Sequence, residues 1–269
     1  MLSITTDYRT GVGTAEPYLR EIARAGFTHV HWCQEWNTDY LYSDREIARI
    51  CSQLNWCRLR VTDLHASAGE TKRWGASDDA VNAAGIALVA NRLRMAAMLA
   101  CDVVVLHLPG EVRTGVPAPA YDAVRRALDA LTARAREHGV RIALENMPDD
   151  NTAALEALFT EYGPDVLGLC YDSGHGHLAG NGLERLAALK DRLLAIHLHD
   201  NDGSADQHRL PFDGAIDWPP LLACIAASPY RKPINLEVSA AGCADTAAFL
   251  AEARVRGARL EGLLYAMRA

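Results

Sequence analysis

The sequence lacks the signatures of a membrane protein, an exported protein or a disulfide-rich protein. No apolar run is long enough to span a bilayer, and the opening residues MLSITTDYRTGVG contain no basic segment followed by an apolar stretch. The seven cysteines are odd in number, form no C-x-x-C pair and mostly lie in apolar segments. We therefore expect a cytoplasmic protein whose thiols are buried and reduced, rather than paired in disulfides or bound to metal.

Positive charge is also scarce. The 27 lysines and arginines are outnumbered by 34 aspartates and glutamates, which gives a formal net charge of −7. This balance opposes nonspecific attraction to a polyanion, so nucleic acid is not the expected partner. No low-complexity run rich in Gly, Pro or Ser could serve as a linker, and 49% of the 269 residues are hydrophobic. The sequence therefore predicts a single domain over residues 1–269.

Short apolar runs alternate with longer helical patterns along the whole chain. The runs are LSITT, THVHWC, RLRVTDLH, DVVVLHL, VRIALEN, VLGLCYD, LLAIHLHD and PINLEV. Helix signals follow them: Ser43 and Glu46 have the spacing of a capping box, and DAVRRALDALTARAREHG carries an apolar stripe that ends at a glycine. Eight such units predict an α/β fold, a single parallel (β/α)8 TIM barrel. An open doubly wound sheet is the alternative, but no G-x-G-x-x-G follows the first strand.

Polar residues close six consecutive strands of this predicted barrel. Residues two apart in a strand share a face, and active sites of such barrels lie at the C-terminal ends of the strands. The polar residues at these ends are Asp63 and His65, His107, Glu145, Asp172, His197 and Glu237. One such residue alone is usually a hydrogen-bonded polar group. Three carboxylates buried side by side, however, require protons or a cation, and a divalent ion also explains the imidazoles.

Four segments resemble the xylose isomerase-like barrels, a family that includes sugar-phosphate isomerases and epimerases, inosose dehydratase and the endonuclease IV branch of apurinic endonucleases. The segments are LENMP, CYDSGHGHL, IHLHDND through GAIDW, and NLEV. The resemblance implies that one divalent ion is held by Glu145, Asp172, His197 and Glu237, and that His175 contacts substrate. Members similar to endonuclease IV hold three zinc ions with a larger set. The positions matching its additional ligands are His65, His107, His175, Asp206 and His208.

Other polar and aromatic residues also lie near the strand ends. We expect His199, Asp200 and Asp202 to support the ligands or to lie in a solvated loop, and we expect His29 and His31 to be structural. Four residues are candidates for binding substrate, although packing or surface charge also explains them: Trp32, Glu35, Trp36 and Arg113.

The ligand set contains only nitrogen and oxygen donors, which suits one to three ions of Zn, Mn, Co or Fe. A cation that stabilises an enediolate, with Glu145 and Glu237 on opposite sides of a hydroxyketone, would support proton transfer next to a carbonyl. The sequence therefore predicts a metal-dependent isomerase, epimerase or related dehydratase that acts on a small sugar or polyol derivative, with His175 as a further catalytic residue.

Two alternatives to this enzyme remain open. The first is a multinuclear-zinc phosphodiesterase resembling endonuclease IV, although the loop HASAGETKRWGAS departs from the H-A-P-Y stretch associated with DNA-reading members. The second is a noncatalytic sugar-binding barrel. The sequence determines neither the substrate nor the oligomeric state.

Overall fold

Eight parallel strands form a ring in the computed structural model, which describes residues 1–112 and 118–268. The strands are β1 (Leu2–Thr5), β2 (His29–Trp32), β3 (Arg60–His65), β4 (Val103–Leu106), β5 (Arg141–Glu145), β6 (Leu167–Asp172), β7 (Leu193–His197) and β8 (Ile234–Leu236). They pair in the order β7-β6-β5-β4-β3-β2-β1-β8. Two backbone hydrogen bonds just beyond β7 close the ring between β7 and β8: Leu198 N donates to Asn235 O (2.9 Å), and Glu237 N donates to Leu198 O (3.1 Å). The predicted (β/α)8 TIM barrel is confirmed.

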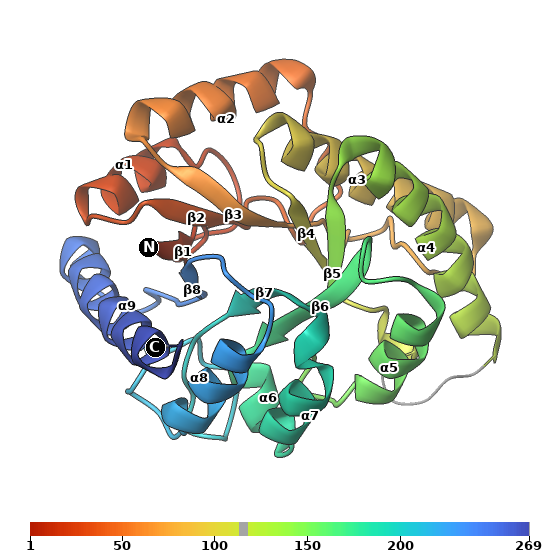
Figure 1. The fold of residues 1–269 in the computed structure, drawn as a ribbon. Helices are drawn as coiled ribbons and strands as arrows, with labels where there is room; N and C mark the ends of the chain where they lie inside the picture. The colour runs from red at the N-terminus through yellow and green to blue at the C-terminus, as the bar shows by residue number, and fades with distance from the viewer. Residues whose placement is uncertain (113–117, 269) are drawn as a thin grey trace.

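Helices surround this ring on the outside (Figure 1). They are α1 (Glu16–Arg24), α2 (Asp44–Cys57), α3 (Asp79–Met98), α4 (Ala118–His138), α5 (Thr152–Glu161), α6 (Ser173–Ala179), α7 (Gly182–Leu189), α8 (Trp218–Ala227) and α9 (Thr246–Arg268), with 3-10 turns at Gly110–Val112 and Lys190–Arg192. Local sequence explains several ends. The Ser43 and Glu46 capping box starts α2, and α4 stops before Gly139, whose φ of +66° favours glycine.

The barrel interior is apolar on one side and polar on the other. A small cluster fills the side formed by β4 to β7: Val103, Val105, Ala143, Cys170, Leu194 and Ala195. Because side chains alternate along a strand, residues two positions after this cluster also face inward, at the C-terminal ends of the strands. On the opposite side, β2 and β3 contribute the fully buried His31 and Asp63. The C-terminal mouth of the barrel is therefore lined by polar side chains.

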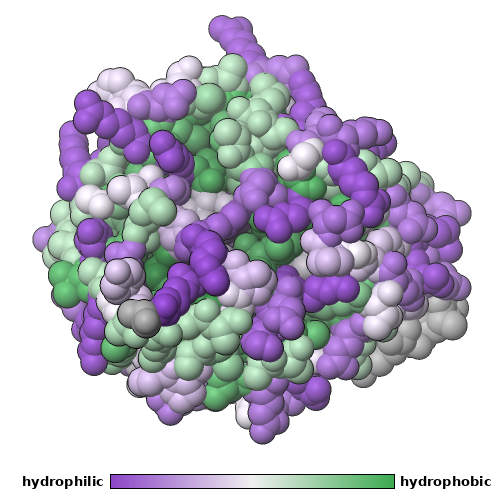
Figure 2. Space-filling view, in the orientation of Figure 1, coloured by the Kyte–Doolittle hydropathy of each residue, from purple (hydrophilic) through white to green (hydrophobic). Residues whose placement is uncertain are grey.

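The outer surface is mixed in polarity. Figure 2 shows hydrophilic side chains spread over one face of the molecule, interspersed with smaller hydrophobic areas. Within the described part of the chain, no helix combines the length and the apolar character that a bilayer crossing requires.

Candidate active site

A cavity of about 530 Å³ opens at the C-terminal mouth of the barrel. Seven of the nine predicted ligands line it: His65, His107, Glu145, His175, Asp206, His208 and Glu237. The remaining two, Asp172 and His197, are completely buried. The fold thus gathers into one region residues that are up to 172 positions apart in the sequence, from His65 to Glu237.

His65, His107 and Glu145 form the first group at the cavity wall. His107 Nε2 lies 3.1 Å from Glu145 Oε2 and 3.2 Å from His65 Nε2. Burial lowers the pKa of His107, so its ring is neutral at physiological pH and can offer a lone pair. The Trp36 ring covers both imidazoles, with centroid separations of 5.0 Å to His65 and 5.6 Å to His107.

His197 occupies the centre of the site, between two carboxylates. Its Nδ1 atom lies 3.2 Å from Glu145 Oε1 and 3.2 Å from Glu237 Oε2. Burial raises the pKa of each glutamate, but the facing His197 ring and the other imidazoles outweigh burial and hold both pKa values well below their usual range. Both carboxylates are therefore ionised, as ligands or proton acceptors must be.

A third group lies across the cavity and combines α6 with the loop after β7. Asp206 Oδ2 is 3.2 Å from His175 Nε2 and 3.2 Å from His208 Nε2. Burial lowers the pKa of both histidines, but the nearby carboxylates outweigh it and raise each pKa to about 10. Without a bound cation, these two rings are therefore protonated and paired with Asp206.

The ends of β5 and β6 are fixed to each other by reciprocal hydrogen bonds. Asn146 Nδ2 donates to Asp172 O (2.9 Å), and Asp172 N donates to Asn146 Oδ1 (2.7 Å). His175 Nδ1 lies 2.9 Å from Asn146 O, and the Asp172 carboxylate accepts from His175 N at 2.7 Å. These bonds set the orientation of the His175 ring before any ligand binds.

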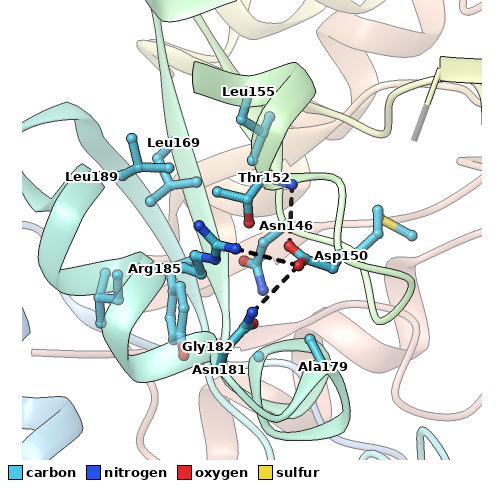
Figure 3. A pocket seen from close by; sticks show the side chains of 14 residues that line it. Asn146, Asp150, Thr152, Leu155, Leu169, Ala179, Asn181, Gly182, Arg185 and Leu189 are labelled. Carbon is cyan, nitrogen blue, oxygen red and sulfur yellow. Dashed lines mark hydrogen bonds and ion pairs between the residues drawn. The ribbon is translucent and has the colours of Figure 1, made fainter. Parts of the chain in front are cut away.

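The loop after β5 is anchored from behind the cavity. Asp150 accepts from Thr152 N and Asn181 Nδ2, each at 3.3 Å, and pairs with Arg185 at 3.6 Å (Figure 3). The adjacent Asn151 donates to the backbone oxygen of Glu145 at 2.8 Å. Asn181, which precedes α7, and Arg185 on α7 therefore hold the loop that supports Glu145.

Two histidines outside the predicted ligand set, His199 and His31, lie within the site. The His199 ring is fully buried, with Nε2 3.0 Å from Asp172, and it stacks on His208 with centroids 4.1 Å apart. His31 contacts Asp63, and its Nε2 lies 3.6 Å from Glu237 Oε1. His199 follows His197 by two positions, so strand alternation was the available signal for it. His31, which we expected to be structural, lies beside the cluster rather than apart from it.

Asp200 and Asp202, which also follow β7, differ in their environment: Asp200 is buried and Asp202 is exposed. Asp200 is fully buried and accepts from Phe212 N (2.9 Å), Ile216 N (3.2 Å) and Trp218 Nε1 (3.1 Å). It thereby folds the loop that carries Asp206 and His208 back over the cavity. Asp202 is exposed and pairs with Arg209 at 2.8 Å.

Of the predicted substrate-binding residues, Trp36 lines the cavity at the mouth. Trp32 and Glu35 instead line a separate cavity of about 250 Å³ beside α2, and the Trp32 ring packs near Tyr42. A direct role for these two residues at the mouth is therefore not supported. Arg113 lies outside the described residues.

The donor atoms fit a divalent cation with nitrogen and oxygen ligands. Groups whose donor atoms all lie within 4.8 Å of one another include His65 with His107 and Glu145, and His199 with His208 and Glu237. The buried thiols of Cys33 and Cys170 also lie close by. Burial raises the pKa of Cys33 to about 12 and that of Cys170 well above its usual range, so both stay protonated and are poor ligands.

A closed (β/α)8 barrel with histidines and carboxylates around its C-terminal mouth defines the class of this protein as a TIM barrel with a polar mouth, and sequence comparison identifies the family. The family model for the xylose isomerase-like TIM barrel matches residues 19–257. The chain belongs to this family.

Individual relatives are distant. A protein of Sinorhizobium fredii named y4fM is 34% identical over 257 residues, covering 86% of this chain and 82% of that protein. A solved structure described as a D-tagatose 3-epimerase-like protein superposes with a TM-score of 0.80 at 18% identity, covering 100% of this chain and 99% of the other. The IolI protein with a bound zinc atom gives a TM-score of 0.73 at 16% identity, covering 98% and 97%. Both structures share the fold of this chain.

Proposed function

We propose that this protein is a divalent-metal-dependent isomerase or epimerase, or a related dehydratase, that acts on a small sugar or polyol derivative. The observation that carries the proposal is the placement of Glu145 and Glu237, which approach the same nitrogen of His197 from two strands at 3.2 Å each. Both carboxylates also line the 530 Å³ cavity, which has room for a small substrate.

Glu145, Asp172, His197 and Glu237 would hold the ion, with His199 as a further candidate from its contact with Asp172. A bound divalent cation would polarise a substrate carbonyl and stabilise an enediolate. In the reaction that we propose, one glutamate removes the proton next to the carbonyl and the other returns a proton. Return to the opposite face of the same carbon gives epimerisation, return to the neighbouring carbon gives isomerisation, and loss of a β-hydroxyl gives dehydration.

His175 is the proposed substrate contact beside these carboxylates. Its ring lines the cavity, and its Nδ1 is held by Asn146 O, so Nε2 points toward Asp206 and the open space. The structural likeness to a D-tagatose 3-epimerase-like protein supports a carbohydrate substrate, and the likeness to zinc-bound IolI supports a divalent ion.

A second function remains a candidate because a specific observation favours it. All nine positions that match the ligands of endonuclease IV-like members line one cavity or lie directly behind it. Two groups contain neither Asp172 nor His197: His65 with His107 and Glu145, and His175 with Asp206 and His208. Such an arrangement supports a multinuclear-zinc phosphodiesterase. The formal charge of −7 opposes a nucleic acid substrate, so we rank this activity below the sugar chemistry. A noncatalytic sugar-binding barrel is the third candidate, and it would not require two ionised glutamates beside the substrate.

The decisive experiment is hydrogen isotope exchange. Metal-loaded protein is incubated in deuterated water with a panel of ketoses, inososes and related hydroxyketones, and deuterium incorporation is measured by mass spectrometry. The proposed function requires incorporation into at least one compound, and replacement of Glu145 or Glu237 by Gln should abolish it even at a metal concentration that refills the site. Glu156→Gln, which changes an exposed carboxylate on α5, is the matched control.

The alternatives predict different results in the same experiment. Metal-dependent cleavage of abasic-site DNA that is lost in His208→Ala, without any exchange on the carbonyl compounds, would replace the proposed function with the phosphodiesterase. Saturable sugar binding with neither exchange nor cleavage would support the noncatalytic barrel.

A further inference from the structure

Below the mouth, the barrel interior contains a buried polar layer that neither the proposed ligands nor the proposed proton transfer explains. It includes His31 on β2 and Asp63 on β3, both 0% exposed. Interiors of such barrels are usually filled by branched apolar side chains, as the opposite side is here. Burying an ionised carboxylate and an imidazole costs free energy that a Leu or Phe in the same place would not.

Asp63 lies between two imidazole rings, those of His31 and His197. It contacts His31 on one side, and its Oδ1 lies 3.6 Å from His197 Nε2 on the other. The two imidazole centroids are only 4.3 Å apart. The carboxylate of Asp63 therefore lies directly behind the central histidine of the site.

The two nitrogens of His197 consequently face opposite environments. Nδ1 faces the mouth, where Glu145 and Glu237 lie at 3.2 Å, and Nε2 faces the buried Asp63. A cation bound at Nδ1 would leave the ring proton on Nε2, and a carboxylate behind that nitrogen would fix the orientation of the ring. For His197 the carboxylate in this place is Asp63, at 3.6 Å.

His31 extends the same support to Glu237. Its Nε2 lies 3.6 Å from Glu237 Oε1, and the Cys33 thiol approaches the same oxygen at 3.9 Å. The other oxygen, Oε2, faces His197. Among the described residues, both nitrogens of His31, both oxygens of Asp63 and His197 Nε2 lack a hydrogen bond of good geometry. Buried polar groups kept at such a cost are typical of functional sites.

We infer that Asp63, supported by His31, is a positioning residue for the candidate metal centre, holding His197 with Nδ1 toward Glu145 and Glu237. This inference rests on the proposed function, because it assumes that the mouth binds a cation. It assigns no catalytic step to Asp63 or His31, since neither lines the cavity.

The test replaces the polar layer with an apolar one. In the double variant His31→Phe/Asp63→Leu, the metal-free protein should melt at the same temperature as the wild type or higher, because a buried ion pair is exchanged for well-packed hydrophobic side chains. The affinity for Zn²⁺ and Mn²⁺, measured by competition with a chromophoric chelator, should nevertheless fall roughly 10- to 100-fold. Asp63→Asn should lose less, since its amide oxygen can still accept from His197 Nε2. Thr62→Val, a buried neighbour on β3, should leave affinity unchanged.

A spectroscopic measurement separates positioning from simple packing. Long-range ¹H–¹⁵N correlation of the histidine rings in the Zn²⁺-loaded wild type should show the metal on Nδ1 of His197 and the ring proton on Nε2, with His197→Gln used to assign the signal. A double variant that binds both metals with wild-type affinity would overturn the inference. If that variant does not fold, Asp63→Asn decides: wild-type affinity together with the metal on Nε2 of His197 in the loaded wild type overturns it. Failure of the wild type to bind either metal would instead refute the proposed function itself.

Discussion

The His199 ring rests directly on Gly174. A Cβ at position 174 would lie 1.9 Å from His199 Cε1, a distance that no packed pair of carbon atoms tolerates. Gly174→Ala must therefore displace His199 from Asp172 or shift the start of α6. We expect a loss of roughly 2 kcal/mol in the free energy of unfolding, together with weaker metal binding.

Chemical denaturation and metal titration of Gly174→Ala check this expectation. Gly262→Ala on α9, where an added Cβ meets nothing within 4 Å, is the control and should be neutral or slightly stabilising. Unchanged stability and affinity in Gly174→Ala would show that His199 does not need its observed position.

The second prediction concerns metal content. We expect the purified protein to carry at least one divalent ion, because three inward carboxylates share the mouth with several imidazoles. Elemental analysis should find this ion, and Glu237→Gln should reduce its occupancy. A ligand that binds only the native state also raises the melting temperature, so chelation should lower it. Identical content, stability and activity in the chelated and loaded protein would contradict the metal site.

The third prediction concerns a second ion beside His65 and His107. The two Nε2 atoms are 3.2 Å apart and share Glu145 as a neighbour, which is an arrangement suited to coordinating one cation. Anomalous scattering from metal-saturated crystals should show this ion in addition to one near His197. Full occupancy at a single position would assign His65 and His107 to substrate binding or to structure instead.

The fourth prediction is a pH dependence that differs between the metal-free and the loaded protein. In the metal-free state the pKa values of His175 and His208 are about 10, above the ordinary value of 6.5. Raised pKa values stabilise the fold fully below pH 6.5, and this contribution is lost as the pH rises toward 10. The melting temperature of the metal-free protein should therefore decline across this window.

Metal binding should show the opposite trend over the same range. Ligand histidines must lose their protons, so apparent affinity at His175 and His208 should rise with pH and binding should release protons. Calorimetry in buffers of different ionisation enthalpy measures the release, and His208→Ala should reduce it. Melting curves that shift in parallel for both forms would count against a cation at this group.

Strand periodicity was enough to predict the barrel and to bring Glu145, His197 and Glu237 to one face, since side chains alternate regularly along an unbroken strand. It did not reveal the neighbour of His31 on β2, because the pairing with β3 shifts register between Val30 and His31. This irregularity pairs His31 with Asp63, and no local pattern in THVHWC indicates it.

Other features of the site depend on contacts that a single sequence does not encode locally. Asp200 looks like a loop residue in HDND, yet three donors from a segment up to 18 positions away converge on its carboxylate. Strand alternation after His197 indicates the side on which His199 lies, but it does not indicate that Asp172 is its partner.

The last seam of the barrel lies within the site itself. The two bonds that join β7 to β8 involve Leu198 and Glu237, so the residues facing each other across the seam are His197 and Glu237. A cation held by both His197 and Glu237 would link β7 to β8 across the weakest junction of the ring. Amide hydrogen exchange at Leu198 and Glu237 should then slow when metal binds, because opening the barrel at this seam would require the ion to leave first.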